Sequence, residues 1–434
     1  MGTFDLISIV KGARISAAFL LGACIFAPFQ EAYAKDQSSS RVQVGLVHSL
    51  SGSMAVVEKG LVAAELLAIE QINADGGLLV DGRQYFIDAL IKDGASRWPV
   101  YARQAEQLIE RNRVPVLFGG WTSASRKAML PVVESKNSLL FYPLYYEGQE
   151  CSKNIFYTGA TPSQQSEPAT RFMFERSPAA GQPFFLVGSD YVFPRTSHAI
   201  TKTQLKSLGG AVVGEEYLPL GDVDVSGIIE KIKASLPKGG VIINHFNGDQ
   251  NIAFFRELRR TGLTPSNGYY VMSYSILEDE ISLIGPDLLK GHYGAWNYVM
   301  SDPSLASRRF VAAFRQRFGE RLVLSDPHES AYNMIYLWKA GVEKANSFAP
   351  EKVAEALVGI RFDAPQGKVE VMPNHHLAQT VRIAQITAQG NYKTVSQSRL
   401  PVKPTAWSQF ESFSRGYGCD WTDPAKGERY RLRR

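Results

Sequence analysis

Polar and aromatic side chains follow six of the short β-branched runs of this chain, at the points where strands are predicted to end. The six loops are residues 48–53, 119–125, 143–148, 188–193, 244–249 and 273–275. They supply hydroxyl, amide, carboxylate and aromatic groups but no cluster of Lys or Arg for an anionic ligand, since Arg126 and Lys127 fall inside a predicted helix. In open α/β sheets, ligands bind beyond the carboxyl ends of the strands. The loops therefore predict a site for one small polar molecule.

The loop 119–125 has a structural explanation as well as a binding one. Gly119 and Gly120 suit a tight turn from strand to helix, and Ser123 suits the N-cap of that helix. The free N–H groups at a helix N-terminus can also receive a ligand carbonyl. Both roles are compatible, so the loop remains a candidate for either.

The motifs of common enzyme and cofactor sites are missing from the sequence. No glycine-rich dinucleotide or Walker motif and no nucleophile elbow occurs. The seven histidines lack metal-ligand spacing, and the adjacent His375 and His376 are expected to form a solvated loop pair. Ser123 has no nearby motif that supplies a base. These observations favour a binding protein with no cofactor, metal or catalytic residue over an enzyme.

The first 34 residues have the pattern of a secretory signal. Lys11 and Arg14 precede an apolar run that is too short to span a bilayer, and Ala32 and Ala34 give small residues at a cleavage site. Residues 1–34 are therefore predicted to be a signal peptide cleaved after Ala34, with a soluble product in the periplasm. A membrane anchor and a lipoprotein modified at Cys24 are the alternatives.

Composition and charge narrow the function class further. The 434 residues suggest two or three domains, and 45% hydrophobic with 21% charged residues is an ordinary globular composition. The net charge of +5 is small, and no long basic run occurs. Nucleic acid is therefore not expected as a partner. Cys151 and Cys419 remain after export; they could pair in an oxidising compartment or stay as free thiols.

The alternation of strand and helix patterns predicts parallel sheets covered by helices on both faces. One sheet would need too many strands, so we expect two doubly wound α/β lobes. The N-terminal lobe is assigned residues 41–160 and 300–365, and the C-terminal lobe residues 161–299 and 366–405. Residues 406–434 are expected to form a tail over the surface. The repeated crossings of the chain between lobes predict a hinge.

The chain resembles the type I periplasmic binding proteins, and closely the urea-binding components of ABC transporters. It is similar, more distantly, to a cytoplasmic amide sensor and to the leucine/isoleucine/valine-binding proteins. The segments that carry the resemblance are 45–52, 121–127, 140–143, 146–148, 153–159, 188–195, 215–220, 295–298 and 362–367.

The resemblance implies a Venus-flytrap architecture with three hinge crossings. It also implies delivery of the solute to the permease subunits of an ABC transporter in the inner membrane. Nine positions are implied to contact the ligand or lie beside it: Trp121, Ser123, Tyr142, Tyr191, Phe193, Asn247, Asp249, Ser275 and Trp296.

The chemistry of these residues is compatible with urea, which is flat and neutral with four N–H donors and one carbonyl. Asp249 and Asn247 can accept hydrogen bonds, Ser123 can donate one, and Trp121 and Tyr142 can form flat walls. Core packing is the alternative for each aromatic residue.

Two positions depart from the wider family. Phe193 stands where the amide sensor has Tyr, and Ser275 stands where amino-acid binders hold an ammonium group with an acidic residue. The second departure argues against a zwitterionic amino acid as ligand. Urea is the expected ligand, with short amides such as acetamide or formamide as the alternative; a branched-chain amino-acid binder, a docking regulator and an exported amidase are less favoured.

Overall fold

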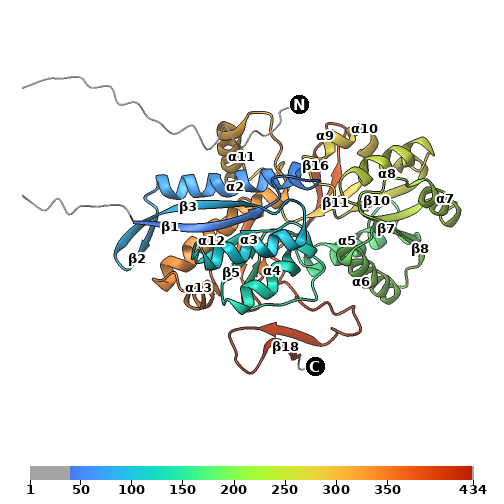
Figure 1. The fold of residues 1–434 in the computed structure, drawn as a ribbon. Helices are drawn as coiled ribbons and strands as arrows, with labels where there is room; N and C mark the ends of the chain where they lie inside the picture. The colour runs from blue at the N-terminus through green and yellow to red at the C-terminus, as the bar shows by residue number, and fades with distance from the viewer. Residues whose placement is uncertain (1–39, 433–434) are drawn as a thin grey trace, which may run out of the picture.

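The computed structural model describes residues 40–432, which form two α/β lobes and a C-terminal extension (Figure 1). The expected signal peptide, its cleavage site and Cys24 lie outside the described residues. Among the helices of residues 40–432, none combines the length and the apolarity needed to cross a bilayer.

The first lobe is built on a six-stranded sheet in the order β2-β3-β1-β4-β5-β6, parallel except for β2. Its strands are β1 (Ser40–His48), β2 (Leu78–Val80), β3 (Arg83–Asp93), β4 (Val116–Gly119), β5 (Leu139–Tyr142) and β6 (Ile155–Tyr157). Strands β4, β5 and β6 are buried throughout, because helices cover both faces of a parallel sheet.

Six long helices belong to this lobe. They are α2 (Ala55–Ala74), α3 (Trp98–Glu110), α4 (Ser123–Ser135), α11 (Leu305–Phe318), α12 (Asp326–Ala345) and α13 (Pro350–Leu357). The last three come late in the sequence, yet α11 and α12 both contact α2, and α12 also contacts β4. The first lobe is therefore assembled from two separate stretches of the chain, as Figure 1 shows by the blue and orange helices side by side.

The second lobe is built on a seven-stranded sheet in the order β16-β15-β11-β10-β9-β7-β8. Its strands are β7 (Phe184–Ser189), β8 (Val212–Leu218), β9 (Gly240–His245), β10 (Tyr269–Ser273), β11 (Tyr293–Trp296), β15 (Arg382–Ile386) and β16 (Tyr392–Gln397). Its helices are α5 (Ser166–Glu175), α6 (Val192–Leu208), α7 (Ser226–Ser235), α8 (Asp249–Arg260), α9 (Ile281–Ile284) and α10 (Pro286–Leu289). Strands β7 to β11 are parallel, and β15 and β16 add an antiparallel edge.

The chain passes between the lobes three times, in the segments 158–165, 297–304 and 379–381. This confirms the predicted fold of two doubly wound lobes joined by a three-crossing hinge. Residues 361–378 differ from the expectation, because they form a separate three-stranded sheet of β12 (Arg361–Ala364), β13 (Gly367–Val371) and β14 (Leu377–Ala378). The second sheet is rejoined only at Arg382.

The pair His375 and His376 was expected to be solvated, and the structure shows that this is wrong. Both residues are buried, and their rings stack on Phe156 and Tyr157 of the neighbouring strand β6 at centroid distances of 4.3 Å. A bridge between Tyr157 and His376 aligns the two backbones, which is why adjacent residues can stack on adjacent rings.

The C-terminal extension is tied to the first lobe by covalent and polar contacts. Cys151 and Cys419 form a disulfide with their Cα atoms 6.6 Å apart, which is the paired alternative of the two considered above. The backbone N–H of Gln149 also donates to the backbone carbonyl of Ala406 at 2.7 Å. The extension ends in the hairpin β17 (Tyr417–Asp420) and β18 (Gly427–Arg431), so it is more regular than the expected irregular tail.

Candidate functional site

A small cavity lies where loops from both lobes meet. Eight residues line it: Trp121, Thr122, Ser123, Leu144, Tyr145, Tyr191, Phe193 and Asn247. They follow strands β4, β5, β7 and β9, so all of them lie beyond the carboxyl ends of parallel strands. The volume is about 10 Å³, close to the space that one water molecule needs. Side chains of the two lobes therefore nearly meet across the cleft.

The first-lobe wall begins with a turn that only glycine permits. Gly119 has a φ of +131°, and a Cβ on it would lie 2.2 Å from the Val47 carbonyl oxygen. The chain then enters α4 through Thr122, whose side chain accepts from the Ser125 amide at 3.0 Å. Thr122 is thus the N-cap, and Ser123, which was a candidate for that role, is the first helical residue.

Ser123 is connected to a buried ionic cluster beneath the cavity. Its Oγ donates to the Glu147 carboxylate and accepts from Arg126 Nη1 at 3.2 Å. Arg126 is fully buried and also donates from Nη2 to Glu147 at 3.3 Å and from Nε to Glu150 at 2.7 Å. The exposed Lys127 donates to Glu150 at 2.8 Å. We call Ser123, Arg126, Lys127, Glu147 and Glu150 the α4 cluster.

Opposite charges offset the burial of Arg126 and Glu150 in the α4 cluster. Burial alone would raise the pKa of Glu150, but Arg126 and Lys127 lower it to about 2. Burial would likewise lower the pKa of Arg126, yet Glu150 and Glu147 raise it above its ordinary value. Two cations face two carboxylates, so the cluster presents no net charge to the cavity.

The predicted wall residue Tyr142 stands behind the cavity rather than in it. Its ring is fully buried, and its hydroxyl donates to the Trp121 carbonyl at 2.7 Å. The Arg126 guanidinium lies 4.8 Å from the centre of the ring. Tyr142 therefore supports Trp121, which does line the cavity.

The second-lobe wall is held by neutral groups. Asn247 Nδ2 donates to Ser189 Oγ at 3.2 Å and to the Tyr191 hydroxyl at 3.4 Å. Ser189 in turn donates to the buried Gln250 at 2.5 Å. Gln250 is anchored by bonds from its amide nitrogen to the carbonyls of Pro219 and Asp222, at 2.8 and 2.9 Å. Phe193 completes this wall and lies 5.5 Å, centroid to centroid, from Tyr145 of the other lobe.

Besides Tyr142, three predicted residues lie outside the cavity lining. Ser275 is buried and donates to the Phe246 carbonyl at 2.5 Å. Trp296 packs edge-on against Tyr145, with ring centroids 5.3 Å apart, as a neighbour of the lining. Asp249 is exposed at the first position of α8, where Gly248 is the N-cap and no side-chain cap bond forms.

Five of the nine predicted residues thus line the cavity: Trp121, Ser123, Tyr191, Phe193 and Asn247. The structure adds Thr122, Leu144 and Tyr145. All three lie in loops that the sequence had marked, but nothing in the pattern showed which side chains of those loops point inward. The acidic partners Glu147 and Glu150 were not recognised, because a carboxylate in a loop reads as a solvated residue.

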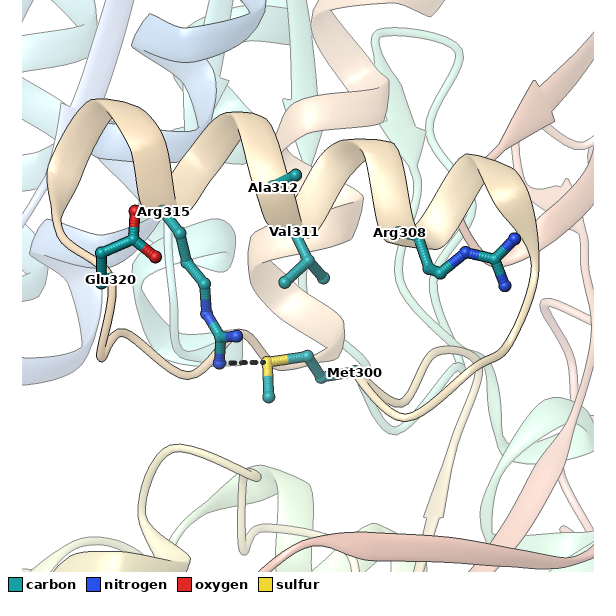
Figure 2. Close-up of a pocket in the computed structure, with 6 residues that line it drawn as sticks. All are labelled: Met300, Arg308, Val311, Ala312, Arg315 and Glu320. Atoms are coloured by element: carbon teal, nitrogen blue, oxygen red, sulfur yellow. Dashed lines mark hydrogen bonds between the residues drawn. The ribbon is translucent and has the colours of Figure 1, made fainter.

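A larger hollow of about 410 Å³ lies elsewhere, along α11. Figure 2 shows its lining of Met300, Arg308, Val311, Ala312, Arg315 and Glu320, with Arg315 donating to the Met300 sulfur. None of the predicted site residues lines this hollow. Within residues 40–432, no group of His, Cys, Asp or Glu is arranged to hold a metal ion.

Comparison with known proteins identifies the family. The periplasmic binding protein domain family matches residues 42–413. The chain belongs to this family. A Leu/Ile/Val-binding protein homolog of Brucella melitensis is 24% identical over 352 residues, which cover 80% of this chain and 87% of the relative.

Solved structures agree on the type I fold of this periplasmic binding protein. A solute-binding protein of an ABC transporter from Rhodopseudomonas palustris, in complex with 3,4-dihydroxybenzoic acid, superposes with a TM-score of 0.73. It is 20% identical, and the match covers 84% of this chain and 98% of that one. A branched-chain amino acid transporter substrate-binding protein of Streptococcus pneumoniae, in complex with isoleucine, gives a TM-score of 0.69 at 18% identity and covers 83% and 99% of the two chains.

The match to the periplasmic binding protein domain family makes this chain a periplasmic binding protein. This confirms the class predicted from the sequence. The relatives above carry aromatic acids or branched-chain amino acids in their names, and none of those names mentions urea or an amide. The identity of the ligand therefore rests on the chemistry of the cavity.

Proposed function

We propose that this periplasmic binding protein takes up urea between its lobes and delivers it to an ABC permease without chemical turnover. The observation that carries the proposal is the cavity itself. Its eight lining side chains are all uncharged, and they combine hydroxyl and amide groups with aromatic rings. A neutral, flat molecule with several hydrogen-bonding atoms matches that surface.

The size of the cavity favours a small ligand. At about 10 Å³ it must widen for any ligand, and the hinge allows the lobes to move apart. Urea has fewer than half the non-hydrogen atoms of isoleucine or benzoate, so it requires less displacement than they do of Tyr145 and Phe193, which nearly meet across the cleft.

The position of Glu147 argues against a carboxylate ligand. Glu147 occupies the position beside Ser123 at the start of α4, where the helix N-terminus would otherwise suit an anion. A ligand carboxylate there would face the carboxylate of Glu147. The branched-chain amino acids and aromatic acids that relatives bind are therefore disfavoured at this end of the site.

Short amides are the second candidate, and Leu144 is the observation that favours them. Its apolar side chain lines the cavity beside the polar groups and would suit the methyl group of acetamide. Urea offers a second amino group there instead. The two ligand classes differ at this contact, and Leu144→Asn should shift preference toward urea.

Calorimetric titration of ligand-free protein tests the proposal. The protein is unfolded in guanidinium chloride, refolded and titrated with urea, acetamide, formamide, isoleucine and benzoate. Urea should bind tightly with one site per chain, acetamide and formamide more weakly, and isoleucine and benzoate far more weakly than either amide. Tight binding of isoleucine or benzoate with no response to urea or the amides would overturn the proposal, and ammonia release at an enzyme-like rate would overturn its non-catalytic part.

A further inference from the structure

The hydrogen-bonding capacity of Ser123 is almost fully used within the protein. A serine hydroxyl has one proton to donate and two lone pairs that accept. The proton is directed to the Glu147 carboxylate, and one lone pair accepts from Arg126 Nη1 at 3.2 Å. Ser123 also lines the cavity. Only the second lone pair is left for a ligand.

Glu147 cannot exchange roles with Ser123 in this bond. An ionised carboxylate accepts hydrogen bonds and donates none. Arg126 donates to its other oxygen at 3.3 Å, and Lys127 Nζ lies 3.9 Å away, so two cations lie beside this carboxylate. The hydroxyl proton of Ser123 is therefore held away from the cavity for as long as Glu147 keeps its charge.

We infer that Glu147 is a specificity-determining residue, which turns Ser123 into a hydrogen-bond acceptor and so selects a ligand with an N–H group over one with a carbonyl or carboxylate oxygen at that position. The inference rests on the proposed function, which places the ligand in this cavity. It reverses the sequence-based expectation that Ser123 donates to the ligand carbonyl.

The opposite wall has the complementary donor. The Tyr191 hydroxyl accepts from Asn247 Nδ2 at 3.4 Å, which leaves its own proton free for the cavity. The Asn247 amide nitrogen is occupied by Ser189, Tyr191 and the His245 carbonyl. Its carbonyl oxygen can then accept from the ligand. Ser123 and Asn247 as acceptors with Tyr191 as donor match the amino groups and carbonyl of urea.

Three pairs of ligands test the inference, because in each pair an amide N–H₂ replaces a carboxylate oxygen in nearly the same shape. The pairs are acetamide with acetate, benzamide with benzoate, and isoleucinamide with isoleucine. The measured quantity is the ratio of amide affinity to acid affinity for the parent, for Ser123→Ala, for Glu147→Gln and for Glu150→Gln. Thermal unfolding of each variant checks that it is folded.

Ser123→Ala distinguishes the two roles of the serine by the direction of the change. If Ser123 accepts a hydrogen bond from the ligand, loss of its hydroxyl weakens binding of the amide only, and the ratio of amide to acid affinity should fall about 2- to 10-fold. If Ser123 donates a hydrogen bond to the ligand, loss of its hydroxyl weakens binding of the acid at least as much as binding of the amide, and the ratio should stay the same or rise. The second outcome overturns the inference.

Glu147→Gln should lower the ratio about 10-fold or more, since the glutamine amide can donate to Ser123 and release the serine proton to the cavity. Glu150→Gln is the matched control, because it removes the same charge from the same arginine without a contact to Ser123. Its ratio should stay within about 3-fold of the parent. Equal effects of the two glutamine variants would attribute the preference to charge alone and overturn the inference.

The inference and the proposed function can fail separately. If benzamide or isoleucinamide binds better than its acid and Glu147→Gln lowers that preference while urea and acetamide are inert, the proposed ligand is wrong and the role of Glu147 stands. If acetamide binds but its preference over acetate is unchanged in Glu147→Gln, the proposed ligand stands and the inference is wrong. If no amide binds at all, both are overturned.

Discussion

The two walls of the cavity differ in how their polar residues are held. In the first lobe Ser123 depends on buried ions, Arg126 against Glu147 and Glu150. In the second lobe Asn247 depends on the neutral Ser189 and Gln250. Buried ion pairs are rigidly specified, because either charge is unstable without its partner. Neutral networks tolerate small shifts at a lower energetic cost.

The same contrast recurs in two buried histidines, each at the end of a strand in one of the lobes. His48 ends β1 and lies between carboxylates, 2.7 Å from Glu65 and 3.5 Å from Glu58. His245 ends β9 and lies 3.1 Å from His198. Burial would lower the pKa of both, but Glu65 and Glu58 raise that of His48 to about 9, whereas burial and His198 keep that of His245 well below 6.5. The buried end of β1 therefore carries a charge, whereas the buried end of β9 carries none.

Replacement of Arg126 by methionine should have the largest effect on stability. Arg126→Met leaves Glu147 and Glu150 buried without their shared cation, and losing one partner of a buried pair typically costs about 3–5 kcal/mol. The free energy of unfolding is measured in guanidinium chloride, since urea is the proposed ligand. A loss below about 1 kcal/mol would show that water or Lys127 replaces the arginine and that the first-lobe wall is not held by ions.

Alkaline pH should weaken the first lobe through His48. Because its pKa in the fold is raised to about 9, its contribution is fully present below pH 6.5 and is lost as the pH rises through 9. The free energy of unfolding should fall by up to about 3 kcal/mol across this window. Burial also raises the pKa of Glu280 and of Glu329 to about 8. These two acids therefore lower the free energy of unfolding further as the pH rises to about 8.

The loss of stability due to His48 is isolated by comparing the parent with His48→Gln between pH 8 and 9.5. Both proteins contain Glu280 and Glu329, so the contribution of these acids cancels in the comparison. The parent should lose stability more steeply than the variant in that interval. Parallel pH profiles would mean that His48 is neutral in the fold and that the contrast with His245 does not exist.

Gln250→Leu probes the neutral wall with a smaller expected loss. The substitution leaves Ser189 and the carbonyls of Pro219 and Asp222 without their partner, which costs about 1–3 kcal/mol. Ligand affinity should also fall, because Ser189 holds Asn247. Calorimetry and guanidinium denaturation measure both effects. A loss as large as that of Arg126→Met would remove the proposed difference between the walls.

The sequence predicted the fold and the loops that line the candidate cavity better than the partners of the lining residues. Strand and helix periods gave both lobes, the rule that ligands bind beyond strand ends pointed to loops 119–125 and 244–249, and the family resemblance selected Ser123 and Asn247 within them. The roles of Glu147 and Arg126 could not be predicted, because a loop acid and a helical arginine become an ion pair only when the loop after β5 folds against α4. Likewise, no periodicity showed that His375 and His376 stack on β6.

Asp249 is where the sequence-based expectation and the structure diverge most, and its substitution should have the smallest effect. A carboxylate after a second-lobe strand looked like an acceptor for urea, yet the side chain is exposed and outside the cavity lining. As an acid in the first turn of α8 it contributes at most about 0.3–1 kcal/mol to stability through the helix dipole. Asp249→Asn and Asp249→Ala should therefore bind urea with an affinity within about 2-fold of the parent.

Calorimetry of both Asp249 variants and of Asn247→Ala tests whether Asp249 contacts the ligand. Asn247→Ala is the reference, because Asn247 lines the cavity two residues earlier in the same loop. If the Asp249 variants lose as much affinity as Asn247→Ala, α8 must move its first turn into the cleft when ligand binds, and the second lobe would then bring a charge to the site that its resting wall excludes.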